Sequence, residues 1–164
     1  MAVHPIDFYL IIVDTTPQGA SEATRRRVAM GSLIPLCEWL ESDRSLKVGL
    51  RLSSAILGYL FLSSPNLSKR IEALYEAGNL LPIGGSSVGA PLHVLSPSDA
   101  AEHIAADRAL WRQAMAVVPE GAWNFAGCYD SHLPEVLAPI GIPFCWAPSR
   151  NLGGVDWGWT ARQG

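Results

Sequence analysis

Two acidic and two imidazole side chains follow predicted strands, at positions where they could hold a metal ion or move a proton. Asp130 and His132 form a D-x-H pair, and a third ligand would have to be His93 or Asp14, because the chain has no H-x-x-x-H pair. The structural alternatives are a helix cap for Asp130, an exposed loop for His132 and a turn cap beside Pro17 for Asp14. We favour these alternatives, so the sequence predicts no metal ion and no cofactor.

A second candidate for chemistry is the glycine-rich segment at residues 85–89, which fits the pattern G-x-S-x-G with Ser87 at its centre. That pattern marks the nucleophile of α/β-hydrolases when a helix follows the serine at once. Here Pro91 and further loop residues intervene, which disfavours a triad of Ser87 with Asp99 and His132. The loop could also contact an anion through backbone N–H groups, but it lacks the lysine of a phosphate-binding loop.

The elements that must position these residues alternate along the chain. Short apolar runs predict strands at residues 6–13, 46–52, 80–83, 122–125 and 142–146. Helical patterns lie between them, at residues 21–40, 55–62, 67–76, 98–117 and 133–140. Strands that alternate with helices predict an α/β fold with a parallel sheet and right-handed crossovers.

Proline, glycine and helix-capping residues support these boundaries. Pro35 predicts a kink or a break in the first helix, and Gly78 stands where a helix commonly ends. The predicted helix caps are Ser21, Asn66 and either Ser96 or Ser98. Trp39 and Trp111 lie on helices, and we expect both in the core.

Sites in parallel α/β folds form at the carboxyl ends of the strands. Trp123 and Trp146 lie at such ends, where their rings could stack on a sugar. The candidate binding residues chosen by this rule are Asp14, Thr15, Ser53, Ser86, Ser87, His93, Trp123, Asp130, His132 and Trp146.

Composition limits the class of protein. The chain has 164 residues, of which 49% are hydrophobic and 16% charged, so it can bury a core. Its net charge of −3 argues against nucleic-acid binding, and we expect the one short basic run, Arg25 to Arg27, to be a solvated helix face. We expect a barrel-like domain over residues 1–150 and a Gly- and Trp-rich tail or hairpin over residues 151–164.

The chain has three cysteines and no C-x-x-C motif, which argues against a disulfide framework or a zinc knuckle. We expect Cys128 and Cys145 to be buried thiols. The apolar run at residues 8–13 is too short to cross a membrane, and the first residues lack the basic start of a signal peptide. We therefore expect no membrane contact and a cytoplasmic location.

Four segments together resemble the N-terminal catalytic barrel of glycoside hydrolase family 57, the group of amylases, branching enzymes and glucanotransferases. Residues 83–97 (IGGSSVGAPLHVLSP) look like its glycine-rich strand end, and residues 123–129 (WNFAGCY) look like its nucleophile segment. Residues 133–144 resemble the helix and strand that follow, and residues 51–57 resemble another strand end. The resemblance covers residues 6–148 and implies an incomplete seven-stranded TIM-like barrel, of which about five strands are present.

The same resemblance implies that the family's chemistry is lost. The nucleophilic glutamate falls on Ala126, a second glutamate falls on Ala90, and the histidines expected near Val13 and Thr15 are absent. A retaining glycosidase needs two carboxyl groups about 5 Å apart, and a methyl group can neither attack an anomeric carbon nor hold a proton. No catalytic residue is assigned.

Three functions fit this sequence. The first is a catalytically degenerate relative that binds a carbohydrate or a protein partner in the strand-end cleft. The second is an active carbohydrate-processing hydrolase, or an enzyme like the metal-dependent polysaccharide deacetylases that share this barrel, with catalysis relocated to Asp14, His93, Asp130 and His132. The third is a subunit, including a homo-oligomer, whose missing strands come from another chain.

Overall fold

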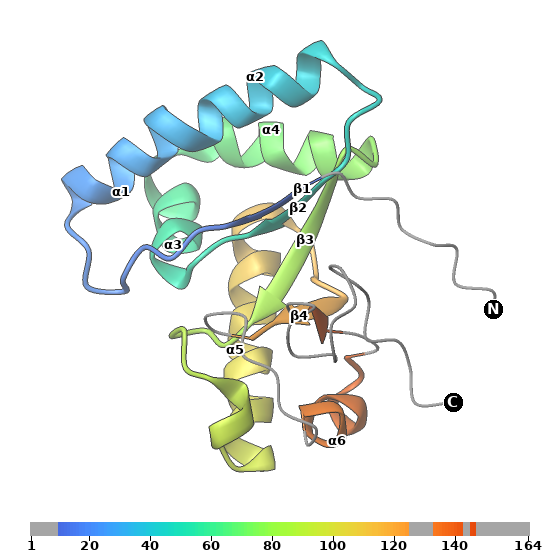
Figure 1. Cartoon of the computed structure of the whole chain (residues 1–164). Helices are drawn as coiled ribbons and strands as arrows, with labels where there is room; N and C mark the ends of the chain where they lie inside the picture. The colour runs from blue at the N-terminus through green and yellow to red at the C-terminus, as the bar shows by residue number, and fades with distance from the viewer. Residues whose placement is uncertain (1–9, 125–132, 143–144, 147–164) are drawn as a thin grey trace.

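The described part of the chain forms five strands with helices between them (Figure 1). The computed structural model describes residues 10–124, 133–142 and 145–146. The strands are β1 (Leu10–Val13), β2 (Val48–Arg51), β3 (Leu80–Gly85), β4 (Gly121–Trp123) and β5 (Cys145–Trp146). The predicted tail at residues 151–164 and the predicted strand residues 6–9, 125, 143 and 144 lie outside the described residues.

All five strands are parallel and lie in the order β1-β2-β3-β4-β5. Each strand therefore pairs with the next one along the chain, as in a barrel, and no strand order reverses. Within the part of the chain that the structure describes, the sheet is open, with β1 and β5 at its two ends. This confirms the predicted α/β fold with a partial TIM-like barrel.

The helices are α1 (Glu22–Val28), α2 (Ile34–Ser42), α3 (Ser54–Ser63), α4 (Pro65–Glu76), α5 (Pro97–Met115) and α6 (Leu133–Leu137). In Figure 1 they form an arc from α1 and α2 at the top, through α3 and α5, to α6 at the bottom. The described residues also form short helical turns: η1 (Ala29–Leu33), η2 (Leu92–Val94) and η4 (Ala138–Ile140).

Local sequence explains most helix ends. The Ser21 hydroxyl accepts the Thr24 N–H at 3.2 Å and caps α1. No break occurs at Pro35, because the chain stays helical from Glu22 to Ser42. The effect of the proline is local: a π-helical segment, η1, precedes α2, and Pro35 lies in the first turn of α2. Gly78 follows α4 with a φ of +75°, a conformation that suits glycine.

Two predictions about helices were wrong. Asn66 does not cap α4, because Pro65 already occupies the first turn, where its fixed φ and missing N–H are favourable, and Ser64 precedes it. Trp39 is 44% exposed, because α2 packs through Leu36, Cys37 and Leu40 instead, whereas Trp111 is 1% exposed as expected.

The core has two parts. The larger cluster gathers buried side chains of α2, α3 and α4 against β2, and includes Leu40, Leu50, Ile56 and Trp111. The smaller cluster joins η2, α5, β4 and α6 around Leu92 and Leu133. Helix α5 contributes to both parts, so it fixes β3 and β4 relative to the rest of the sheet.

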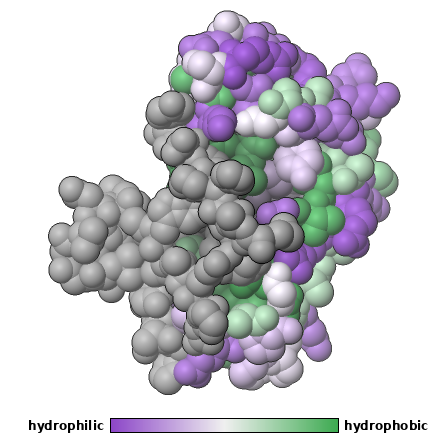
Figure 2. Space-filling model, turned by 90° about the vertical axis from the view of Figure 1, so that its right-hand side faces the viewer, coloured by the Kyte–Doolittle hydropathy of each residue, from purple (hydrophilic) through white to green (hydrophobic). Residues whose placement is uncertain are grey.

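The surface agrees with a helix-covered domain. Figure 2 shows hydrophilic side chains over much of the described part of one face, with apolar patches between them. No helix among the described residues is long and apolar enough to cross a membrane. Cys145 is buried, as expected, and Cys37 is buried as well, while Cys128 lies outside the described residues.

Candidate functional site

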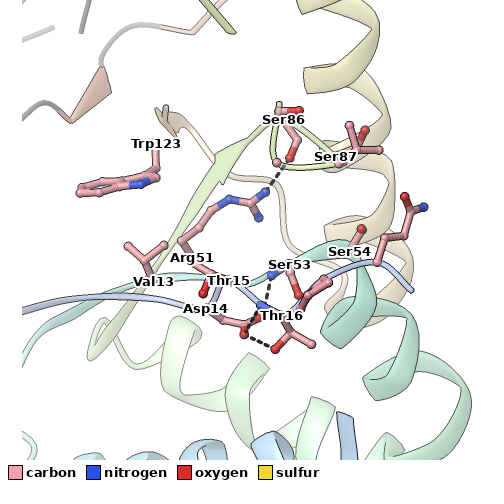
Figure 3. Close-up of a pocket in the computed structure, with 14 residues that line it drawn as sticks. Val13, Asp14, Thr15, Thr16, Arg51, Ser53, Ser54, Ser86, Ser87 and Trp123 are labelled. Atoms are coloured by element: carbon pink, nitrogen blue, oxygen red, sulfur yellow. Dashed lines mark hydrogen bonds between the residues drawn. The ribbon is translucent and has the colours of Figure 1, made fainter. Parts of the chain in front are cut away.

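A cavity of about 300 Å³ opens at the carboxyl ends of β1 to β4, where the strand rule places a site (Figure 3). Six of the ten predicted binding residues line this cavity. They are Asp14, Thr15, Ser53, Ser86, Ser87 and Trp123. The other lining residues are Val13, Thr16, Pro17, Gln18, Arg51, Ser54, Val88 and Gly89.

Asp14 fixes the loop after β1. Its Oδ1 accepts the backbone N–H of Thr16 at 3.0 Å and the Thr16 hydroxyl at 2.5 Å. Its Oδ2 accepts the N–H of Ser53 at 3.0 Å, which ties β1 to the start of α3 (Figure 3). The turn-cap interpretation of Asp14 is therefore correct, because both carboxylate oxygens already accept hydrogen bonds from the protein.

Ser53 performs a similar structural task. It is the N-cap of α3, and its hydroxyl accepts the N–H of Ile56 at 3.3 Å. Its backbone N–H is the group held by Asp14. One edge of the cavity thus consists of polar side chains whose positions are set by hydrogen bonds between neighbouring strand ends.

A buried ion pair lies in the wall of the cavity, and sequence reasoning missed it. Arg51, the last residue of β2, is 6% exposed, and its Nη2 lies 3.0 Å from Oδ1 of Asp107 on α5. The contact at Oδ1 is an ion pair, because its geometry is not that of a hydrogen bond. Arg51 also donates to the carbonyl of Leu52 and, at 2.9 Å, to the carbonyl of Ser86.

Asp107 is completely buried, and its Oδ2 accepts the N–H of Gly85 at 3.1 Å. Burial raises the pKa of Asp107 to about 6, because the loss of hydration outweighs the opposing effects of the Arg51 charge and the Gly85 N–H. At acidic pH the positive charge of Arg51 in the cavity wall is therefore only partly balanced, because Asp107 is then partly protonated.

Two glycines at the end of β3 make this arrangement possible. A Cβ at Gly85 would lie 2.6 Å from the carbonyl oxygen of Trp123 and 3.2 Å from Nε of Arg51. A Cβ at Gly84 would lie 3.1 Å from the carbonyl oxygen of Gly121 and 3.3 Å from Oδ2 of Asp107. The glycine-rich strand end therefore permits close approach of the neighbouring strand and of the ion pair.

The loop after β3 is held by its own hydrogen bonds. The carbonyl of Ser86 accepts the N–H of Gly89 at 3.2 Å, and Gly89 has a φ of +74°. The Ser86 hydroxyl accepts the N–H of Ala90 at 2.9 Å. Ala90, at the position of a family glutamate, is half-buried and does not line the cavity.

Ser87 meets a histidine that the sequence did not single out. Its Oγ lies 3.1 Å from Nδ1 of His103 on α5. Ser87 lines the cavity, whereas His103 is half-buried and does not. The helix places the imidazole behind the hydroxyl, as seen from the cavity.

His93 lies elsewhere. Its Nδ1 is 2.9 Å from Nδ2 of Asn124, whose Oδ1 accepts the N–H of Leu92 at 2.7 Å. His93 therefore helps to hold η2 against the end of β4 and does not line the cavity with Asp14. The structure does not bring these two proposed catalytic residues together at the cavity wall.

Several predicted site residues cannot be placed. Asp130, His132 and Ala126 lie outside the described residues, and of Trp146 only the backbone, in β5, is described. Within residues 10–124, 133–142 and 145–146, no three His, Cys, Asp or Glu side chains gather as metal ligands would.

Part of what sequence reasoning missed had a signal. Asp107 lies three residues after Ile104 and four before Trp111, on the buried face of α5. An acid in an apolar helical stripe predicts a buried partner, since an unpaired buried charge is costly. The partner itself, like the contacts of His103 and Asn124, depends on tertiary placement that the local sequence does not encode.

Comparison with known proteins identifies the fold. No protein-family model matches the chain, and no curated protein matches it. Among solved structures, a 4-alpha-glucanotransferase from Thermococcus litoralis superposes with a TM-score of 0.77 at 18% identity, over 88% of this chain and 23% of that one. The alpha-amylase AmyC from Thermotoga maritima gives 0.67 at 12% identity, over 84% of this chain and 39% of that one.

A putative polysaccharide deacetylase from Mycobacterium smegmatis gives a TM-score of 0.53 at 12% identity, over 88% of this chain and 53% of that one. The chain thus spans about a quarter to a half of the length of these structures. At such identities the similarity shows the fold, which is that of carbohydrate-active barrels, and agrees with the resemblance to glycoside hydrolase family 57.

Proposed function

We propose that this protein is a catalytically degenerate relative of the family 57 barrels, which binds an oligosaccharide in the strand-end cavity. The observation that carries the proposal is the state of the acids there. Among the described residues that line the cavity, Asp14 is the only carboxylic acid, and its two oxygens accept hydrogen bonds from Thr16 and Ser53. A retaining glycosidase needs two carboxyl groups about 5 Å apart, one of them free to attack.

The lining of the cavity supports binding of a carbohydrate. Hydroxyl groups of Thr15, Ser54 and Ser87 lie along the wall, where they can exchange hydrogen bonds with sugar hydroxyls. The half-buried Trp123 supplies an apolar ring. In Figure 3 it lies on the other side of Arg51 from Ser54 and Ser87. A volume of about 300 Å³ is at the lower end of ligand sites, so we expect the end of a glycan chain to enter.

Isothermal titration with maltooligosaccharides tests the proposal. We expect saturable binding, and Trp123→Ala should weaken it about tenfold, which corresponds to about 1.4 kcal/mol. Trp39→Ala is the matched control, because Trp39 is exposed on α2 and does not line the cavity. An absence of heat with every oligosaccharide, or equal affinity of the Trp123→Ala and wild-type proteins, would refute sugar binding at this place.

A second candidate function is that of one part of a larger barrel. The observation in its favour is the described sheet, which ends at β1 and β5, together with the greater length of the similar structures. Open edge strands favour association with another chain, here a protein partner or a second copy. Light scattering at high protein concentration tests the homo-oligomer, and a strictly monomeric species would contradict it.

A further inference from the structure

The contact between Ser87 and His103 combines a serine that lines a cavity with a histidine that does not. The Oγ to Nδ1 distance is 3.1 Å, within the range over which a base can take a proton from a hydroxyl. Ser87 also occupies the central position of the G-x-S-x-G pattern at residues 85–89. This pair differs from the disfavoured triad, which required His132.

Both members of the pair are held in place by contacts on either side. Before Ser87, the residue Ser86 is 3% exposed, and its carbonyl accepts from Arg51. The Ser86 hydroxyl accepts the Ala90 N–H, which closes the loop around Ser87. One turn after His103, Asp107 accepts the N–H of Gly85, so the same strand end anchors both α5 and the loop. Such support from neighbouring contacts is what a preorganised catalytic pair requires.

We propose that Ser87 and His103 form a nucleophile and general-base pair that hydrolyses a small carboxylic ester in the cavity. Ser87 Oγ forms a bond to the carbonyl carbon while its proton passes to Nδ1 of His103. Collapse of the tetrahedral intermediate breaks the bond between carbon and the alcohol oxygen, and His103 returns the proton to the departing alcohol. Water, deprotonated by His103, then forms a bond to the acyl carbon. The bond between that carbon and Ser87 Oγ breaks, His103 returns the proton to Oγ, and the carboxylic acid leaves.

The charge of the cavity wall suits this step. The tetrahedral intermediate carries a negative oxygen, which a nearby cation or N–H donor stabilises. Among the described lining residues, Arg51 is the one cationic side chain; its guanidinium group pairs with Asp107 and donates to the carbonyl of Ser86, the residue next to Ser87. In Figure 3 its guanidinium group points toward the loop that carries the serine.

A fluorophosphonate probe tests the nucleophile, because it forms a stable bond only with an activated serine. We expect the intact mass of the wild-type protein to increase by one adduct and peptide mapping to locate it at Ser87. In His103→Gln the labelling rate should fall about 100-fold, within the range of general-base effects. Ser63→Ala, at an exposed serine of α3 that does not line the cavity, is the control and should label at the wild-type rate.

Hydrolysis of p-nitrophenyl acetate provides the second measurement. The activity should be lost in Ser87→Ala and kept in Ser63→Ala, and added imidazole should restore part of it in His103→Ala. A pair that only tethers the loop to α5 would give no adduct at Ser87 in the wild-type protein, and that result overturns the proposal. Labelling of His103→Gln at the wild-type rate overturns the role of the histidine. Neither result bears on oligosaccharide binding, which the titration tests separately.

Discussion

The pH dependence of folding stability offers a direct test of the buried pair of Arg51 and Asp107. The pKa of Asp107 rises from 3.8 to about 6 because burial disfavours its charged form. Between these two values the native state binds more protons than the unfolded state, so the free energy of unfolding falls as pH rises. The contribution of Asp107 is fully present below pH 3.8 and is lost as pH rises through about 6.

The size of the effect follows from the shift. The pKa changes by about two units, and each unit corresponds to about 1.36 kcal/mol, so the full contribution of Asp107 is about 3 kcal/mol. Most of this is lost between pH 4 and pH 7. Other carboxyl groups act in the opposite direction, among them Glu41, whose pKa the hydrogen bond from Arg70 lowers. The wild-type curve alone is therefore a sum, and a variant is needed to isolate Asp107.

Asp107→Asn removes the titrating group and keeps its size. Urea unfolding followed by circular dichroism, at half-unit steps from pH 4 to pH 7, gives the free energy of unfolding of both proteins. The wild-type value minus the variant value should fall by about 2 to 3 kcal/mol across this range. Only the slope is interpreted, because the asparagine also loses one of two acceptor oxygens at every pH.

Either of two results would refute this reasoning. A flat difference would show that the pKa of Asp107 is the same in both states. A difference that rises with pH would show that the attraction of Arg51 exceeds the cost of burial, so that the pKa is lowered. Arg51→Met provides a further check, because removal of the cation should move the loss of stability to higher pH.

Three further predictions concern single positions. Gly85→Ala should lower the free energy of unfolding by about 1–3 kcal/mol in urea unfolding, because the added Cβ would lie 2.6 Å from the Trp123 carbonyl oxygen; an unchanged value would contradict the close approach. Asp14→Ala should cost about 1–3 kcal/mol in the same assay, and more than Asp43→Ala, which removes the same kind of local turn bonds without a link to the start of another element. Burial raises the pKa of Cys37 to about 11, so alkylation mapped by mass spectrometry at pH 8 should modify Cys37 in urea and spare it in the native protein; rapid native labelling would contradict this.

Much of the fold could be predicted because local patterns and the global arrangement agree. The alternation of apolar runs with helical patterns gave all five strands and the parallel sheet. Gly78 marked a real helix end and Pro35 lies in the first turn of α2, since proline and glycine act through their own backbone conformations. Asn66 and Trp39 were misjudged because neighbouring residues decided the outcome: Pro65 fixed the start of α4, and the other face of α2 entered the core.

The site was predictable in outline and not in its interactions. The strand-end rule found Asp14, Ser53 and Ser86, because parallel strands bring their carboxyl ends to one edge whatever their side chains. It could not show that the Asp14 carboxylate accepts hydrogen bonds from the backbone N–H groups of Thr16 and Ser53. Nor could it pair Ser87 with His103, which depends on how α5 packs against β3.

The hydrogen-bond partners of the polar groups in this cavity distinguish two kinds of chemistry, attack on a sugar by a carboxylate and acyl transfer by a serine. Both oxygens of Asp14 accept hydrogen bonds from the protein, and Asp107 is buried against Arg51 and does not line the cavity, so neither of these two acids is placed to attack a sugar. Ser87 lines the cavity and has a base beside it. Chemistry that needs a free carboxylate is therefore disfavoured here, while acyl transfer, which needs a hydroxyl and a base, is not. Oligosaccharide titration and serine labelling consequently test different groups of the same cavity, and each can succeed without the other.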